Sequence, residues 1–148
     1  MTDIRFYHLQ VKPLQQALPE ILSKAYERGH RVVVMAENEK HVESLNALLW
    51  TYGSKSFLPH GSEKEGDAKD QPIWLTVKDE NPNSADVLVL VDGVTSENIK
   101  GYKLCCEVFD GNDEQAVKQS RKHWKSYKED GYELTYYQQT NTGGWQEK

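Results

Sequence analysis

Two short segments of the chain are apolar at almost every position. They are Arg31–Met35 (RVVVM) and Val87–Val91 (VLVLV). A strand with one face in water alternates apolar and polar side chains, whereas a continuous apolar run of this length is typical of a strand covered on both faces. Such strands occur in parallel sheets that carry helices on either side. The sequence therefore predicts an α/β fold with three layers, α/β/α.

The segments around these two runs alternate between strand-like and helix-like patterns. Apolar residues at helical spacing predict helices over Pro13–Arg28 and about Lys40–Trp50. Further strands are predicted at Ile4–Leu9, Ile73–Val77, Leu104–Phe109 and, as an edge strand, Leu134–Tyr137. A chain of 148 residues has the length of one domain. We expect residues 1–148 to form a single domain with a mostly parallel central sheet, mixed at its edge, and about 138–148 to form a loosely ordered tail.

Sheets of this Rossmann-like kind often bind nucleotides, but this sequence lacks the motifs that hold phosphate. It contains neither GxGxxG nor GxxxxGK followed by Ser or Thr, and the turn after the first strand reads QVKPLQQ, without a glycine. Asp92 ends the run VLVLVD, which resembles a magnesium-binding strand, although a turn at Asp92-Gly93 explains it as well. We expect a Rossmann-like fold without a nucleotide site, and a nucleotide-dependent enzyme that uses Asp92 is the alternative.

The sequence shows no pattern of a metal site or of a membrane segment. None of the five histidines pair at i, i+4, and no CxxC occurs. Cys105 and Cys106 are adjacent, so on a strand they point to opposite faces and fit buried, reduced thiols. No apolar run approaches the roughly 20 residues of a membrane span. We expect no catalytic residue, no metal, no cofactor and a cytoplasmic location.

A basic and aromatic segment contrasts with the formal net charge of −5. Residues 115–131 read QAVKQSRKHWKSYKEDG and hold five Lys or Arg residues. Helical spacing places Val117, Arg121, Trp124 and Lys128 on one face. An apolar ring framed by cations suits an acidic peptide tail that ends in a hydrophobic residue. A solvated basic face is an alternative, as is direct binding of single-stranded nucleic acid, which the net charge disfavours.

Two further aromatic residues flank a polar, glycine-containing stretch. Trp50 ends the second predicted helix, and Phe57 opens an apolar island in the long loop 53–71. Each ring is either a core residue or an exposed anchor for a partner, and the composition does not decide between these.

Several sequence blocks together resemble one known family. In chain order they are FYHL, GHRVVV, LLWTYGSKSFLPHG, QPIWLT, SADVLVLVDG and SRKHWKSYKEDGYELTYY, between Phe6 and about Tyr137. This order is similar to that of the chi subunit of bacterial DNA polymerase III holoenzyme. The resemblance implies a non-catalytic adaptor in DNA replication, with an α/β fold that lacks a nucleotide site. It also implies contact with DNA only through other proteins, in the cytoplasm at the nucleoid.

The resemblance further implies two partner surfaces. The acidic C-terminal tail of single-stranded DNA-binding protein would bind at Arg121, Trp124, Lys125, Lys128 and Val117. The psi subunit of the clamp loader, or a helicase that competes for the same surface, would bind at Trp50 and Phe57. The turn Asp110-Gly111-Asn112 is less apolar than the family pattern, so one wall of the tail pocket departs from it.

Overall fold

The computed structural model describes residues 2–51, 59–64 and 66–148, so Phe57 lies outside the described residues. Its strands are β1 (Asp3–Leu9), β2 (Val32–Met35), β3 (His60–Ser62), β4 (Ile73–Thr76), β5 (Val87–Leu90), β6 (Leu104–Asp110), β7 (Glu133–Gln139) and β8 (Trp145–Glu147). Its α-helices are α1 (Leu14–Glu27), α2 (Glu39–Thr51) and α3 (Glu114–Glu129), and two short 3-10 helices are η1 (Ala68–Asp70) and η2 (Ile99–Gly101). This part of the chain forms one sheet in the order β3-β4-β2-β5-β6-β1-β7-β8. Every pairing in it is parallel except that of β7 with β8.

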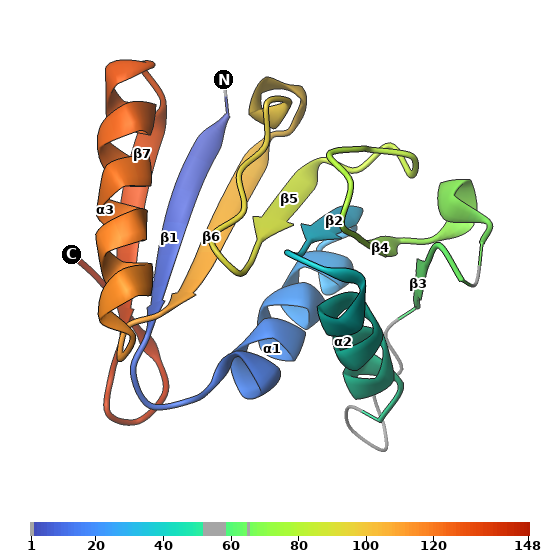
Figure 1. The fold of residues 1–148 in the computed structure, drawn as a ribbon, viewed down its shortest axis with the longest axis horizontal. Helices are drawn as coiled ribbons and strands as arrows, with labels where there is room; N and C mark the ends of the chain where they lie inside the picture. The colour runs from blue at the N-terminus through green and yellow to red at the C-terminus, as the bar shows by residue number, and fades with distance from the viewer. Residues whose placement is uncertain (1, 52–58, 65) are drawn as a thin grey trace.

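The helices divide between the two faces of the sheet and make the three predicted layers. α1 and α2 share one apolar cluster with alternate residues of the central strands, and α3 shares the other. On β2, Val32 and Val34 belong to the first cluster, whereas Val33 and Met35 belong to the second. α3 lies along β1 and β7, while α1 and α2 lie towards the other half of the sheet (Figure 1). Coverage on both sides explains why β2 and β5 are apolar without alternation.

The adjacent cysteines Cys105 and Cys106 confirm that both faces of the sheet are buried. Cys105 lies in the cluster on the α3 face and Cys106 in the cluster on the α1 face, and both are free thiols. Burial raises the pKa of Cys105 well above its ordinary value and that of Cys106 to about 12. Both thiols therefore stay protonated and act as small apolar residues.

The structure differs from the sequence prediction at both edges of the sheet. β7 is not an edge strand, because β8 pairs beside it as an antiparallel strand. The segment 138–148, for which we expected a loosely ordered tail, contains the end of β7 and all of β8. At the opposite edge, β3 forms inside the long polar loop and pairs with β4.

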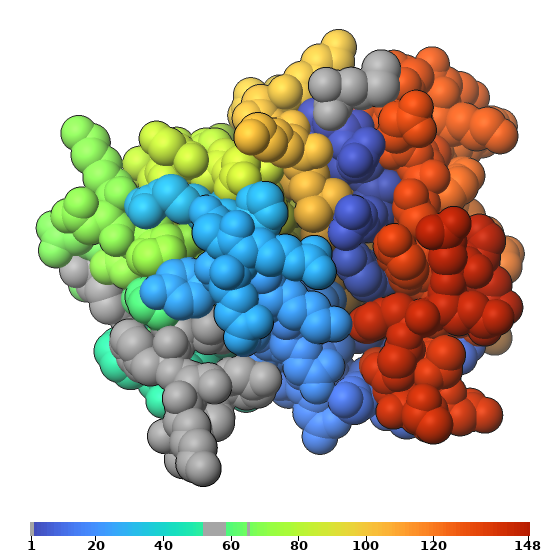
Figure 2. Space-filling view, turned by 180° about the vertical axis from the view of Figure 1, so that it is seen from behind, coloured from blue at the N-terminus to red at the C-terminus, as the bar shows by residue number. Residues whose placement is uncertain are grey.

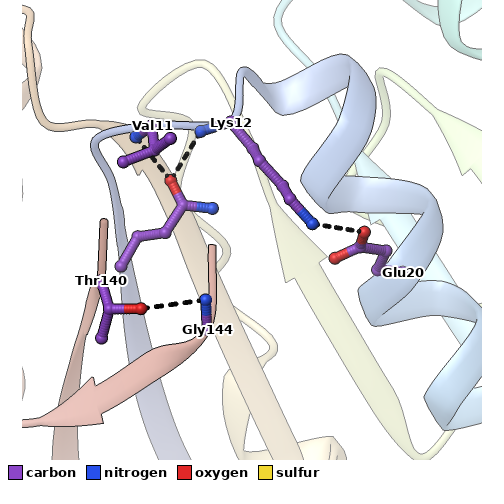
Figure 3. Close-up of polar contacts among 6 residues, drawn as sticks. Val11, Lys12, Glu20, Thr140 and Gly144 are labelled. Carbon is purple, nitrogen blue, oxygen red and sulfur yellow. Dashed lines mark hydrogen bonds and ion pairs between the residues drawn. The ribbon is translucent and has the colours of Figure 1, made fainter. Parts of the chain in front are cut away.

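One side chain near the C-terminus closes the turn between β1 and α1. The amide oxygen Oε1 of Gln139 accepts hydrogen bonds from the backbone N–H groups of Gln10, Val11 and Lys12, at 3.0, 2.8 and 2.9 Å. Gln139 is buried, with 2% of its surface exposed. Figure 3 shows two of these bonds, the ion pair between Lys12 and Glu20, and the hairpin bond from the Gly144 N–H to the Thr140 hydroxyl. Gln139 thus occupies the turn in which many α/β proteins hold a phosphate.

Candidate functional site

The helix α3 is bounded by an aspartate cap at its start and by a glycine after its end. The side chain of Asp113 caps the helix by accepting hydrogen bonds from the N–H groups of Gln115 and Ala116, at 3.0 and 3.4 Å. Gly131 follows the helix with a φ of 87°, a conformation that glycine adopts without strain. Ser120 and Tyr127 face the sheet and are buried. The helix is therefore fixed in register over β6, β1 and β7.

Trp124 lies in the seam between α3 and β7. Its ring is half-buried and meets Phe6 of β1 edge to face at 5.3 Å and Tyr136 of β7 edge to face at 5.9 Å. Val117, two turns earlier on the same face, is also half-buried against this cluster. The sequence prediction placed both residues on one face, and the structure places that face beside β7. The seam is thus a strip of apolar surface that remains partly exposed.

Arg121 is exposed and lies beside the same seam. Burial raises the pKa of the Tyr136 hydroxyl, and the positive charge of Arg121 opposes that rise. Burial also lowers the pKa of His8, and Arg121 lowers it further while Asp110 acts in the opposite direction. Both effects require the guanidinium to be close to Tyr136 and His8. Arg121 therefore lies within electrostatic range of Tyr136, the residue whose ring Trp124 contacts.

The aromatic rings of His8, Phe109 and Tyr136 pack together on the sheet near Arg121. None of these three residues was predicted from the sequence as a site residue. His8 Nδ1 hydrogen bonds with the Tyr136 hydroxyl. The ring of Phe109 lies 5.1 Å from that of His8 and 6.2 Å from that of Tyr136. These residues come from β1, β6 and β7, which are neighbours only in the sheet. His8 lies two residues after Phe6 in FYHL, and residues two apart on a strand share a face. This spacing is the one sequence signal that could have placed His8 on the α3 face.

The cations of α3 are available to a ligand. Lys125 and Lys128 are exposed, and among the described residues neither of them nor Arg121 forms a salt bridge. The opposite flank of the helix is different, because His123 pairs there with the buried carboxylate of Glu107. Burial raises the pKa of Glu107, and its bond with His123 acts against the rise. One flank of α3 is thus structural, and the other is cationic and open.

Trp50 forms a separate exposed surface on the other half of the sheet. It lies at the end of α2 and is 55% exposed, which favours the partner-anchor interpretation over a core position. Its ring meets His60 of β3 edge to face at 5.1 Å. The structure does not bring Trp50 to the α3 seam, because β3 and β7 lie near opposite ends of the strand order.

The comparison with known proteins decides the family. A family model described as "DNA polymerase III chi subunit, HolC" matches residues 1–135. The chain belongs to the chi subunit family of DNA polymerase III. Three relatives agree. "Probable DNA polymerase III subunit chi" of Rickettsia prowazekii is 32% identical over 109 residues, which cover 74% of this chain and 66% of the relative. "DNA polymerase III subunit chi" of Escherichia coli is 27% identical over 135 residues (89% and 86%), and that of Pseudomonas aeruginosa is 25% identical over 138 residues (90% and 94%).

Membership of the chi family sets the role of the chain at a coarse level. It is an accessory subunit of a DNA polymerase rather than a catalytic one, and it associates with the polymerase holoenzyme in DNA replication. In the part of the chain that the structure describes, no helix is long and apolar enough to cross a membrane. Within the same ranges, no three His, Cys, Asp or Glu side chains are arranged to hold a metal ion.

The crevice in which a doubly wound fold binds nucleotides is acidic in this chi-family chain. It lies outside the carboxyl ends of the strands and holds a cavity of about 320 Å³. Its titratable lining residues are Glu37, Asp92, Glu107, Asp110 and Asp113. Asp92 accepts hydrogen bonds from the Glu37 N–H at 3.1 Å and from His41 at 2.5 Å, which accounts for it as a turn residue. Carboxylates at this density repel phosphate, so these residues do not fit a nucleotide.

Proposed function

We propose that this chi-family chain is a non-catalytic adaptor that binds the acidic C-terminal tail of single-stranded DNA-binding protein on α3. The observation that supports the proposal most directly is the position of Arg121. This exposed cation has no salt bridge among the described residues and lies beside the half-buried ring of Trp124. A cation without an internal partner next to an open apolar seam fits a ligand that carries a carboxylate and an apolar side chain.

Each part of such a tail has a matching group. Arg121 would hold the terminal carboxylate through two parallel hydrogen bonds. The terminal apolar side chain would lie in the seam formed by Val117, Trp124 and Tyr136. Lys125 and Lys128 would attract the preceding aspartates, because both are exposed on the same flank. One anchored ring with a few charge contacts corresponds to about micromolar affinity, or roughly −8 kcal/mol.

We propose that the second surface, around Trp50 and Phe57, links the chain to the clamp loader through psi, or to a helicase. The exposure of Trp50 supports this assignment, and Phe57 stays a prediction because it lies outside the described residues. Since Trp50 and Trp124 lie on different halves of the sheet, one chain would hold both partners at once. In this role the chain would act as a single domain, located at the nucleoid in the cytoplasm.

The test is a titration of the full chain with a labelled acidic peptide that ends in phenylalanine, followed by fluorescence anisotropy. We expect Arg121→Ala to lose about 1–3 kcal/mol of affinity, or roughly 5- to 150-fold. The matched control is Lys122→Ala, which removes an exposed cation from the same helix but from another face. Amidation of the peptide's carboxyl terminus should weaken binding to wild type and have little effect on Arg121→Ala. An equal loss of peptide affinity in Arg121→Ala and Lys122→Ala would contradict the proposed site.

A further inference from the structure

A second cationic recess lies on the sheet face opposite α3. Its cavity measures about 170 Å³ and is lined by α1 on one side and by Trp145 of β8 on the other. Strands β1, β5 and β6 form its floor through residues such as Tyr7, Val89 and Cys106. Figure 2 shows this face, with β1 in dark blue visible between α1 in lighter blue and the C-terminal segment in red. The α3 seam is not part of it, because none of the lining residues belongs to α3.

The apolar wall of the recess depends on the end of the chain. Trp145 of β8 meets the ring of Tyr7 edge to face at 5.0 Å, and Tyr137 stacks on Tyr7 at 5.4 Å. Burial raises the pKa of the Tyr7 hydroxyl to about 12, so the ring stays neutral. Trp145 lies beyond residues 1–135, the part that the family model matches. The family match therefore does not cover Trp145, the β8 part of this wall.

The rim of the recess carries three cations without a salt bridge among the described residues, one of which, Arg5, hydrogen bonds with Tyr7. Arg5, Lys24 and Arg28 line it, and none of them forms a salt bridge with another described residue. The carboxylate of Glu20 also lines it but is already paired with Lys12 at 3.0 Å. In a chain with formal net charge −5, three cations outside any salt bridge around one apolar hollow form a local positive surface.

We propose that this recess binds an acidic peptide segment by taking up one of its apolar side chains. The side chain would lie in the hollow against the touching rings of Tyr7 and Trp145, while carboxylates on either side of it would pair with Arg5, Lys24 and Arg28. The size of the hollow favours a single side chain, because sites for whole small ligands usually measure about 300–1,000 Å³. A whole nucleotide would therefore not fit into a cavity of about 170 Å³. The recess is separate from the site on α3, so neither proposal depends on the other.

The experiment uses a labelled peptide with one phenylalanine between four aspartates and an amidated C-terminus. The amide removes the carboxylate on which Arg121 would act, and the full chain carrying Arg121→Ala serves as the background. We expect Lys24→Gln with Arg28→Gln, which change an exposed residue of α1 and the exposed C-cap residue after it, to weaken binding at least about threefold, the scale of two surface ion pairs. The matched control is Lys40→Gln with Lys100→Gln, which removes two exposed lysines elsewhere. In a ¹⁵N spectrum, the indole N–H signal of Trp145 should shift with peptide, and that of Trp124 should not.

Three outcomes would overturn the proposal. One is an equal loss of affinity in the control pair, because the effect would then be one of overall charge. A second is a Trp145 signal that does not move at saturating peptide. A third is competition by an equal concentration of thymidine monophosphate, because the recess would then select phosphate rather than an acidic peptide. Lys24 and Arg28 are exposed, one on α1 and the other at its C-cap, so the glutamine variants should fold as the wild type does.

Discussion

The bond pattern of Gln139 leads to a quantitative prediction for Gln139→Leu. One buried oxygen accepts three backbone N–H groups, and leucine has a similar size but cannot accept any of them. Each bond contributes about 0.5–1.5 kcal/mol net, so the upper limit for three bonds is roughly 4.5 kcal/mol. Water can replace part of this, since Gln10 and Val11 are exposed residues. We therefore expect a loss of about 2 kcal/mol in the free energy of unfolding, and a melting temperature about 5 °C lower.

Urea unfolding followed by circular dichroism measures this loss. The control is Gln138→Leu, because Gln138 points to the other face of the sheet and has no side-chain hydrogen bond to the described residues. The m-value should not change, since both variants fold to the same surface area. If Gln139→Leu is as stable as Gln138→Leu to within about 0.5 kcal/mol, the three bonds do not hold the turn and the reasoning fails.

Gln139→Glu tests the same hydrogen-bond geometry, but here we expect a gain in the free energy of unfolding instead of a loss. The Nε2 amide of Gln139 is buried with no hydrogen-bond partner among the described residues, and a carboxylate would replace that unpaired donor with an oxygen while keeping the acceptor. Three N–H groups should favour its charged form and depress its pKa in the folded state. The added stability should then be present above the ordinary glutamate pKa and be lost as the pH falls through the lowered one. No gain over wild type at pH 7 would contradict this.

Three further predictions concern the two partner surfaces. Arg121→Ala should raise the pKa of His8 in an NMR titration of its ring protons, because Arg121 helps to lower that pKa. Since the pKa of His8 is lowered in the folded state, His8 contributes stability above pH 6.5 that is lost as the pH falls below that value. Trp124→Ala should cost about 2 kcal/mol of stability, since the half-buried ring packs on Phe6 and Tyr136, and Trp124→Tyr should recover at least half of that in the same urea experiment. Trp50→Ala should leave the unfolding midpoint unchanged, because the ring is 55% exposed, yet it should reduce the recovery of clamp-loader proteins in a pull-down; a variant that melts early would show that Trp50 supports the fold.

The elements that the sequence predicts well are those set by local patterns. Buried strands such as β2 and β5 have no polar residue to mislead, and α3 begins at a capping aspartate, Asp113, with an acidic residue in its first turn. The pattern fails for β3 and β8. Both are three-residue strands in polar segments that form through backbone pairing with a neighbour, so neither has an apolar signature of its own.

The candidate site was predicted in part for a related reason. Helical spacing alone places Arg121 with Trp124, because those two residues belong to one element. The surrounding residues His8, Phe109 and Tyr136 converge from three strands, and only the order of the sheet brings them together. The exposure of Trp50 could not be predicted either, since a large ring at a helix end fits a core position equally well.

The place of β1 between β6 and β7 has a consequence for synthesis in the cell. The first strand to leave the ribosome obtains both of its lateral neighbours from the final third of the polypeptide. Pairings across so great a chain separation form slowly, and until they form both long edges of β1 can pair with other chains. Nascent chains that stop before Glu133 should therefore be prone to aggregate and to need chaperones, whereas release of the complete chain allows the sheet to close around β1.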